Sequence, residues 1–297
     1  MMVLFFVFSF IMCVLTFLLF GMDKQKAIRG DWRIPEKVLL GCSVLFGGIG
    51  GFLGMVFFHH KTQKRTFKIL IPLFALLQGF LLAFFVWTLD YYQAEPSALA
   101  ALQSDPSVAV EETAHYWFFD GPSEETAFFF YPGGKVDTAA YAPLLHELAG
   151  NGVDCYLLKM PFHLAFFGMN APEPIMKSSS YVRYYIGGHS LGGVAASSFA
   201  ASHAVDGIVL LASYPVDDLD TDVLLIYGSE DTVVNRERIR EASGLVHGIY
   251  SEVLIEGGNH AQFGNYGAQK GDGMARISAE EQQRQAIKKM LQFMSNE

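Results

Sequence analysis

The chain has 297 residues, of which 51% are hydrophobic, 14% aromatic and only 17% charged, a composition too apolar for an average soluble protein. Residues 1–89 carry nine Lys or Arg against three Asp or Glu, whereas residues 90–297 carry twelve against twenty-seven. Residues 1–89 are therefore net basic, and residues 90–297 are net acidic. The acidic balance of the second part excludes a general nucleic-acid binder, and the many aromatic and branched residues exclude a disordered chain.

Two segments of the N-terminal part are long and apolar enough to be transmembrane helices. Residues 3–20 contain only Ser9 and Thr16 as polar residues, and residues 69–89 form a second apolar run that ends near Trp87. At 1.5 Å per residue, each run approaches the roughly 30 Å thickness of the hydrocarbon core. The first run fits a retained anchor better than a cleaved signal peptide, because no basic residue precedes it and no small-x-small cleavage site follows it.

The apolar segment between them, residues 38–58, contains six glycines. This pattern predicts either a closely packed third crossing or a broken, re-entrant segment. The flanking loops 22–37 and 59–68 are both basic, and re-entry would leave both in the cytoplasm. Residues 69–134 contain no Lys or Arg, which favours an extracytoplasmic C-terminal domain. We therefore expect a multi-pass membrane module at residues 1–89 with the lipid bilayer as its partner.

Four short motifs in this module carry a resemblance to a known family: Asp23-Lys24, Arg33-Ile34-Pro35-Glu36, Gly47-Gly48 and His60-Lys61-Thr62. They resemble a small bacterial membrane family called domain of unknown function 1294, over roughly residues 1–85. The resemblance implies a bacterial cell membrane and no particular chemistry. Asp23 and Lys24 are interpreted as an ion pair at the membrane edge. His59 and His60 are interpreted as interfacial residues, because the sequence around them holds no carboxylate or thiol with which to bind a metal.

The C-terminal part alternates strand-like and helix-like segments. Residues 90–110 are rich in Ala, Ser, Pro and Gln, which predicts a linker before a domain at 111–297. Continuous apolar strands separated by helices predict an α/β fold with a mostly parallel sheet covered on both faces. The expected strands are 115–119, 127–131, 153–158, 181–186, 207–211, 223–227 and 250–255, and the expected helices are 138–149, 193–203, 235–242 and 279–294.

Three of these strands end at residues that can carry chemistry. Strand 181–186 leads into Gly188-His189-Ser190-Leu191-Gly192, the G-x-S-x-G pattern in which small residues permit a tight strand-to-helix turn at the serine. Asp231 follows strand 223–227, and His260 follows strand 250–255. The carboxyl ends of parallel strands meet at one edge of a sheet, so we expect the three side chains to lie close together.

These motifs carry a second resemblance. Tyr131-Pro132-Gly133-Gly134, Gly188-His189-Ser190-Leu191-Gly192-Gly193, Gly228-Ser229-Glu230-Asp231 and Gly258-Asn259-His260 occur in the order that the α/β-hydrolase fold requires. Residues 110–297 thus resemble the α/β-hydrolase superfamily, and in particular its compact, capless branch of esterases and dienelactone-hydrolase-like proteins. The resemblance implies an α/β-hydrolase fold. The short segment 212–221, where many members insert a helical cap, predicts an open active site.

The expected roles follow from the chemistry of acyl transfer. Ser190 would be the nucleophile, His260 its general base, and Asp231 the group that orients the imidazole. Glu230 is an alternative acid, less well placed than its neighbour. The backbone N–H of Leu191 would be one oxyanion donor, and that of Gly134 or Lys135 the second.

Together these features predict a membrane-anchored serine hydrolase that cleaves an ester or related acyl bond of a small molecule with water. A hydrolase of amides, thioesters or lactones would use the same residues, and a non-catalytic membrane scaffold or binding protein is a further alternative. No cofactor is expected, because the sequence has no Walker motif and no dinucleotide fingerprint. No metal site is expected from the cysteines at positions 13, 42 and 155, which are widely spaced. The oligomeric state is left open.

Overall fold

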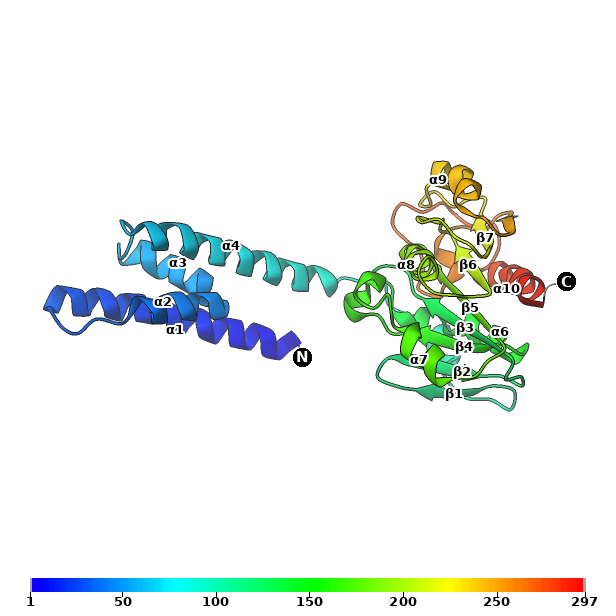
Figure 1. Cartoon of the computed structure of the whole chain (residues 1–297), viewed down its shortest axis with the longest axis horizontal. Helices are drawn as coiled ribbons and strands as arrows, with labels where there is room; N and C mark the ends of the chain where they lie inside the picture. Colours follow the sequence, from blue (N-terminus) through cyan, green and yellow to red (C-terminus); the bar gives the residue numbers. More distant parts are fainter. Residues whose placement is uncertain (1, 296–297) are drawn as a thin grey trace. The chain divides into compact units, whose positions relative to one another are not determined.

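The computed structural model describes residues 2–295, which divide after Asp90 into two compact units (Figure 1). The N-terminal unit is helical and consists of α1 (Met2–Arg29), α2 (Glu36–Cys42), the π-helical turn η1 (Ser43–Gly47), α3 (Gly48–Phe57) and α4 (Arg65–Thr88). Among residues 2–295, three helical stretches are long and apolar enough to cross a membrane: Val3–Arg29, Glu36–Phe57 and Arg65–Thr88.

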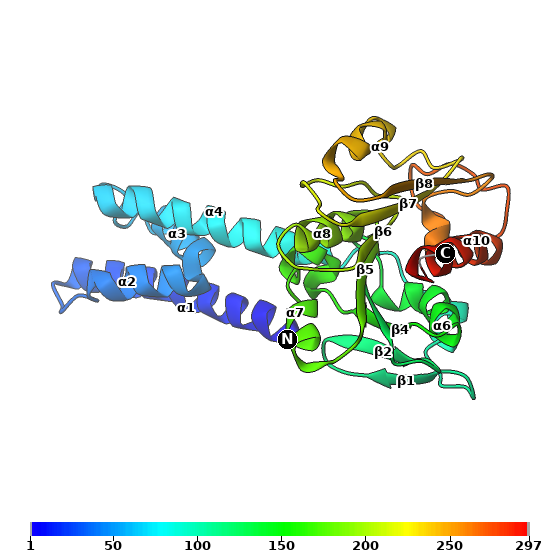
Figure 2. The ribbon, with the colours of Figure 1, turned by 45° about the vertical axis from the view of Figure 1, so that its right-hand side comes forward.

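The middle stretch turns back on itself. The backbone of Leu45 (ψ 53°) and Phe46 (φ 63°) breaks the helix between α2 and α3. Glu36, at the start of α2, forms an ion pair with Lys61, which follows α3; Glu36 Oε1 lies 2.7 Å from Lys61 Nζ. A continuous helix of 22 residues would hold its ends about 33 Å apart. Residues 36–57 therefore form a helical hairpin that begins and ends at the same end of the unit, as both ribbon views show (Figures 1 and 2).

Close backbone packing and one amide side chain stabilise this hairpin. A Cβ atom on Gly50 would collide with the carbonyl oxygen of Cys13, so only glycine lets α3 approach α1 this closely. At the break, Gln78 of α4 accepts the N–H of Ile49 at 2.9 Å and donates to the carbonyl of Phe46 at 2.6 Å. Because an unsatisfied backbone group costs several kcal/mol in hydrocarbon, Gln78 supplies the hydrogen bonds that the broken helix lacks.

The end of the hairpin holds a buried carboxylate whose partner the sequence interpretation gave wrongly. Asp23 is fully buried, and its Oδ2 lies 2.7 Å from His60 Nε2 and 3.0 Å from an Arg33 guanidinium nitrogen. The expected pairing of Asp23 with Lys24 is therefore replaced by partners from other segments, and a carboxylate does lie beside His60. The sequence could not reveal these contacts, because they join residues 10 and 37 positions apart.

The C-terminal unit is built on an eight-stranded sheet in the order β1-β2-β4-β3-β5-β6-β7-β8. Strands β1 and β2 run antiparallel to their neighbours, and the remaining six strands are parallel. The strands are β1 (Ala109–Glu112), β2 (Tyr116–Asp120), β3 (Thr126–Tyr131), β4 (Asp154–Leu158), β5 (Arg183–His189), β6 (Gly207–Leu211), β7 (Asp222–Gly228) and β8 (Tyr250–Ile255). The mostly parallel α/β architecture predicted from the sequence is confirmed.

Each face of the sheet is covered by its own helices (Figures 1 and 2). Phe128 and Phe130 of β3 pack in a core with α6 (Ala142–Gly150) and α10 (Ala279–Ser295). Phe129 and Tyr131, which point to the opposite face, pack in a second core. The helices of that second core are α7 (Pro172–Ser178), α8 (Leu191–Ala200) and α9 (Arg236–Ala242). Burial on both faces explains why the β3 sequence is continuously apolar.

The segment expected as a linker, residues 90–110, folds onto the domain instead. It contains the short helix α5 (Pro96–Ala100) and the start of edge strand β1. Ala98 and Val108 are buried, and the N–H of Glu95 donates to the carbonyl of Asn265 at 2.8 Å. One turn of helix and a polar edge strand have too weak a pattern to stand out in a sequence rich in small residues.

Candidate active site

Ser190 lies at the sharp turn between β5 and α8. Its backbone has φ 52° and ψ −119°, a conformation that residues other than glycine rarely adopt. The turn is tight because Gly188 and Gly192 lack side chains: a Cβ on Gly188 would meet the Gly192 backbone, and one on Gly192 would meet the Tyr131 carbonyl. The Ser190 N–H donates to Leu211 O at 2.9 Å, and the Ser213 hydroxyl donates to Ser190 O at 2.8 Å. Strain held in place by its surroundings is typical of a reactive position.

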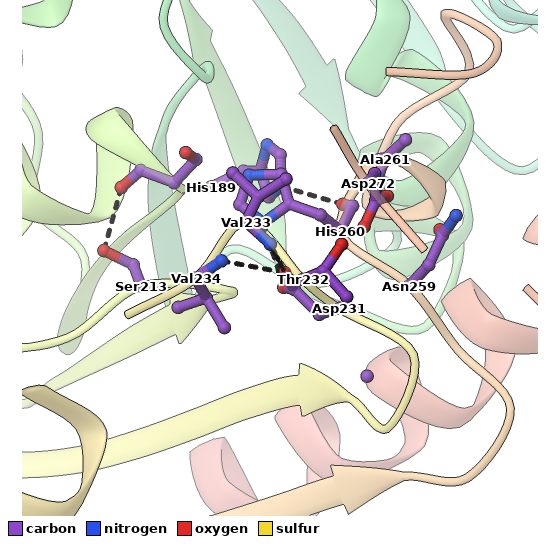
Figure 3. Close-up of polar contacts among 12 residues, drawn as sticks. His189, Ser213, Asp231, Thr232, Val233, Val234, Asn259, His260, Ala261 and Asp272 are labelled. Carbon is purple, nitrogen blue, oxygen red and sulfur yellow. Dashed lines mark hydrogen bonds and ion pairs between the residues drawn. The ribbon is translucent and has the colours of Figure 1, made fainter. Parts of the chain in front are cut away.

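Asp231 and His260 come from two loops that follow neighbouring strands, β7 and β8, and they meet in the interior (Figure 3). His260 Nδ1 lies 2.9 Å from Asp231 Oδ2. The other oxygen, Asp231 Oδ1, accepts the N–H groups of Val233 and Val234, both at 2.8 Å. Two backbone donors and one imidazole thus hold the carboxylate in a single orientation. A carboxylate at Nδ1 places the imidazole proton there, which leaves the Nε2 lone pair available as a base.

His260 Nε2 is buried and has no hydrogen-bond partner among residues 2–295. The His260 ring packs against the ring of His189, the residue before Ser190, with 4.6 Å between centroids. The imidazole therefore lies beside the turn that carries the serine. An unpartnered buried nitrogen at this place can receive a proton from a hydroxyl that approaches it, since catalytic hydrogen bonds are often incomplete without substrate.

The backbone around His260 is held by polar residues that the sequence did not single out. Gln282 of α10 accepts the N–H of Asn259 at 2.9 Å and donates to the Asn259 carbonyl at 2.8 Å. Asp272 Oδ2 accepts the N–H of Ala261 at 2.9 Å, as Figure 3 also shows. The two residues next to His260 are thus fixed from both sides. The one available signal was a glutamine on the buried face of an otherwise amphipathic C-terminal helix.

The alternative acid, Glu230, faces away from the imidazole. Its carboxylate pairs with Arg276 and accepts the Ser229 hydroxyl. The hydrogen bond from Arg276 holds the pKa of Glu230 below its usual range. Glu230 is therefore engaged in a surface ion pair, and Asp231 alone of the two contacts His260.

The glycine turn after β3 contains the two candidates for the second oxyanion donor, Gly134 and Lys135. The N–H of Lys135 donates to the carbonyl of His163 at 2.8 Å, and the N–H of Gly133 donates to the Tyr141 hydroxyl at 3.0 Å. Lys135 is therefore excluded as a donor by a contact that only the folded chain reveals. Gly134 lies directly against Leu191, because a Cβ on Gly134 would collide with the Leu191 side chain. The two remaining candidate N–H groups, those of Gly134 and Leu191, thus belong to residues that lie side by side in space.

No helix lies between β6 and β7 in the described chain, where residues 212–221 run as an irregular segment. The carboxyl edge of the sheet, where Ser190, Asp231 and His260 lie, thus carries no helical insertion at that position. Among residues 2–295, no group of three or more His, Cys, Asp or Glu side chains is placed to hold a metal ion.

The N-terminal unit has relatives of its own. Residues 13–67 match the family described as protein of unknown function DUF1294. Over 74 residues the chain is 38% identical to the uncharacterized protein YsdA of Bacillus subtilis (strain 168), an alignment that covers 25% of this chain and 83% of that protein. The resemblance read from the N-terminal motifs is confirmed.

Three solved structures illustrate what the C-terminal unit is similar to. One is described as a predicted CIB-like hydrolase of Thermoplasma acidophilum, with 18% identity and a TM-score of 0.47 over 62% of this chain and 99% of that one. A dienelactone hydrolase of Anabaena variabilis ATCC 29413 has 15% identity and a TM-score of 0.47 over 62% and 94% of the two chains. An esterase of the planctomycete Thermogutta terrifontis has 14% identity and a TM-score of 0.44 over 64% and 93%.

The family model described as alpha/beta hydrolase family matches residues 127–284, just over half of the chain. This range runs from β3 through the first turn of α10, and it includes Ser190, Asp231 and His260. With the eight-stranded sheet and its two helical layers, the match identifies this chain as a member of the α/β-hydrolase family.

Proposed function

We propose that this chain is a membrane-anchored serine hydrolase that cleaves an ester or related acyl bond through Ser190, His260 and Asp231. The observation that carries the proposal is the buried Asp231–His260 pair, joined at 2.9 Å, with its Nε2 atom unpartnered beside the strained serine turn. A buried carboxylate that contacts an imidazole at Nδ1 is the arrangement that orients a general base, and it supports a catalytic role for Asp231.

In the first half of the proposed reaction, Ser190 Oγ attacks the acyl carbonyl carbon while His260 Nε2 takes the hydroxyl proton. The carbonyl oxygen becomes an oxyanion that accepts hydrogen bonds from the N–H groups of Leu191 and Gly134. The intermediate then expels the leaving alcohol, which takes the proton from His260. Asp231 stabilises the imidazolium that exists between these two transfers.

In the second half, water replaces the alcohol. His260 Nε2 removes a proton from water as the water oxygen attacks the acyl carbon of the acyl-enzyme. When the intermediate collapses, the bond from the acyl carbon to Ser190 Oγ breaks and His260 donates that proton to Ser190 Oγ. The products are a carboxylic acid and the regenerated enzyme. Proton transfer of this kind contributes about 10²- to 10⁴-fold to the rate, and each oxyanion donor about 10²- to 10³-fold.

The N-terminal unit would anchor the enzyme in a bilayer. Its outward-facing side chains on α1 and α4 are apolar and exposed, among them Leu4, Phe10, Leu76 and Phe80, a large apolar surface of the kind that lipid covers. The 36–57 hairpin leaves the two basic loops at the same end of the unit, where Lys61 meets Glu36. We assign that end to the cytoplasm by the positive-inside tendency, which places the hydrolase unit outside.

The sidedness is tested by fusing reporters after Glu297. An alkaline phosphatase that is active only outside the cytoplasm should gain activity, while a green fluorescent protein fused at the same point should stay dark. Fluorescence without phosphatase activity would refute the assignment.

The catalytic proposal is tested with the full chain purified in detergent micelles and a fluorophosphonate probe, which forms a covalent bond only with an activated serine. We expect wild-type protein to be labelled, and Ser190→Ala and His260→Ala to lose labelling together with hydrolysis of short p-nitrophenyl esters. Ser198→Ala is the matched control, because Ser198 lies on α8, the helix that follows Ser190, and its hydroxyl donates to Asp217 at 2.8 Å. Folded wild-type protein that is neither labelled nor active would refute the mechanism.

A further inference from the structure

Behind Ser190, a chain of buried hydrogen bonds joins the glycine turn to the His260 loop. Tyr141 ends the 3₁₀ turn η2 (Thr138–Tyr141), and His189 is the last residue of β5. The Tyr141 hydroxyl accepts the N–H of Gly133 at 3.0 Å and lies 2.8 Å from His189 Nδ1. His189 Nε2 lies 3.0 Å from the carbonyl oxygen of His260. Tyr141, His189 and His260 are each at most 1% exposed.

The donors and acceptors in this chain can be arranged in one consistent way. The N–H of Gly133 can only donate and the carbonyl of His260 can only accept. The Tyr141 oxygen therefore accepts from Gly133 and gives its own proton to His189 Nδ1, and His189 donates its Nε2 proton to His260 O. This arrangement needs a neutral His189. Burial, assisted by the nearby His260, holds the pKa of His189 well below its usual value.

We propose that Tyr141 and His189 are positioning residues. Their hydrogen bonds hold the Gly133-Gly134 turn and the His260 backbone at fixed positions relative to Ser190. Tyr141 fixes the backbone of Gly133, whose neighbour Gly134 carries the candidate oxyanion donor. His189 fixes the backbone of His260 at the residue that moves the proton. Neither side chain touches the substrate in this role, and the inference rests on the proposed serine-hydrolase mechanism.

Packing alone does not supply this function. Apolar contacts are non-directional, whereas these hydrogen bonds set distances and angles between the end of β5 and the segments that follow β3 and β8. Displacement of a catalytic group by about 1 Å can lower the rate about 100-fold. The pair therefore affects the turnover step more than it affects substrate binding.

The test uses the full chain in detergent micelles, with ester hydrolysis and fluorophosphonate labelling as readouts. Tyr141→Phe keeps the ring and removes the hydroxyl, and we expect kcat and the labelling rate to fall about 10- to 100-fold with KM within threefold. His189→Gln keeps an N–H that can reach His260 O, so it should retain more activity than His189→Phe. Tyr185→Phe is the matched control, because it removes a buried hydroxyl from β5, the strand that ends in His189. Among residues 2–295, that hydroxyl donates to Met294 O at 3.2 Å.

The outcomes separate this inference from the proposed function. If wild-type activity depends on Ser190 but Tyr141→Phe keeps kcat within threefold of wild type, the inference is overturned and the hydrolase stands. If wild type has no Ser190-dependent activity, both fall together. Thermal unfolding monitors the fold of each variant. Should Tyr141→Phe not fold, equal kcat values for His189→Gln and His189→Phe would overturn the inference on their own.

Discussion

Replacing Asp231 with Asn should trap His260 in the wrong tautomer. The structure dictates which way the new amide faces. Asp231 Oδ1 accepts two backbone N–H groups, from Val233 and Val234, so the amide oxygen must stay there and the NH₂ group must face His260 Nδ1. An NH₂ group at that position makes Nδ1 an acceptor and moves the imidazole proton to Nε2. The lone pair of His260 then lies at Nδ1, and Nε2 cannot accept the proton of Ser190.

The expected losses of kcat and of stability follow from the hydrogen bonds that each variant removes or keeps. Loss of the correct tautomer in a serine triad lowers kcat about 10⁴-fold, which corresponds to roughly 5.5 kcal/mol of transition-state stabilisation. The two backbone hydrogen bonds to Oδ1 survive, so the melting temperature should stay near that of wild type. Asp231→Ala leaves those N–H groups unsatisfied and should cost about 1–3 kcal/mol per group in folding free energy, but it does not force the tautomer.

The assay is steady-state ester hydrolysis by the full chain, paired with thermal unfolding of each variant. We expect Asp231→Asn to be a stable, nearly inactive protein, and Asp231→Ala to be less stable yet no less active than Asp231→Asn. A folded Asp231→Asn variant that retains more than a tenth of wild-type kcat would show that Asp231 does not orient the base.

Three further outcomes are expected. Gln78→Leu removes the hydrogen bonds at the break in the 36–57 hairpin and should lower the free energy of unfolding by about 1–3 kcal/mol. Thermal unfolding in detergent measures this loss, ester hydrolysis should stay near wild type, and an unchanged melting temperature would contradict the prediction. Because burial lowers the folded-state pKa of His189 below its unfolded value near 6.5, its stability contribution is complete above that pH and is lost as pH falls. Below pH 6.5 the unfolding free energy should drop about 1.4 kcal/mol per pH unit more steeply for wild type than for His189→Gln in denaturant titrations, and parallel pH profiles would argue against a buried neutral imidazole. Gly192→Ala places a Cβ against the Tyr131 carbonyl and should reduce kcat at least about 100-fold. Gly150→Ala is the control and should leave kcat unchanged, because the nearest atom to its Cβ is 3.7 Å away. An active Gly192→Ala protein would mean that the turn tolerates displacement.

Much of the fold could be predicted because its signals are local. Continuous apolar runs such as 127–131 and 207–211 mark strands buried on both faces, and the structure has strands there. The glycines around Ser190 mark a tight turn, because only residues without side chains let the backbones of β3, β5 and α8 approach this closely. The order of Ser190, Asp231 and His260 at strand ends likewise lies in the sequence, since parallel strands place their carboxyl ends at one edge.

Other features depend on contacts between distant segments. The six glycines of residues 38–58 suit both a packed crossing and a broken helix, and the ion pair between Glu36 and Lys61 distinguishes them, because only a hairpin brings those residues together. The bond from the Lys135 N–H to the carbonyl of His163 removes one of two equivalent oxyanion candidates.

The positions of Tyr141 and His189 are a matter of tertiary structure in the same way. Tyr141 belongs to no pattern of acyl-transfer chemistry in the sequence, and His189 occupies a position of the G-x-S-x-G pattern at which any residue is allowed. The two residues meet across 48 positions of the chain. Periodicity and motif spacing report on neighbours along the chain, so they identify strands, turns and the order of reactive groups. Which donor finds which acceptor is determined by the packing of whole elements, and that information appears only when the sheet and its helices are assembled.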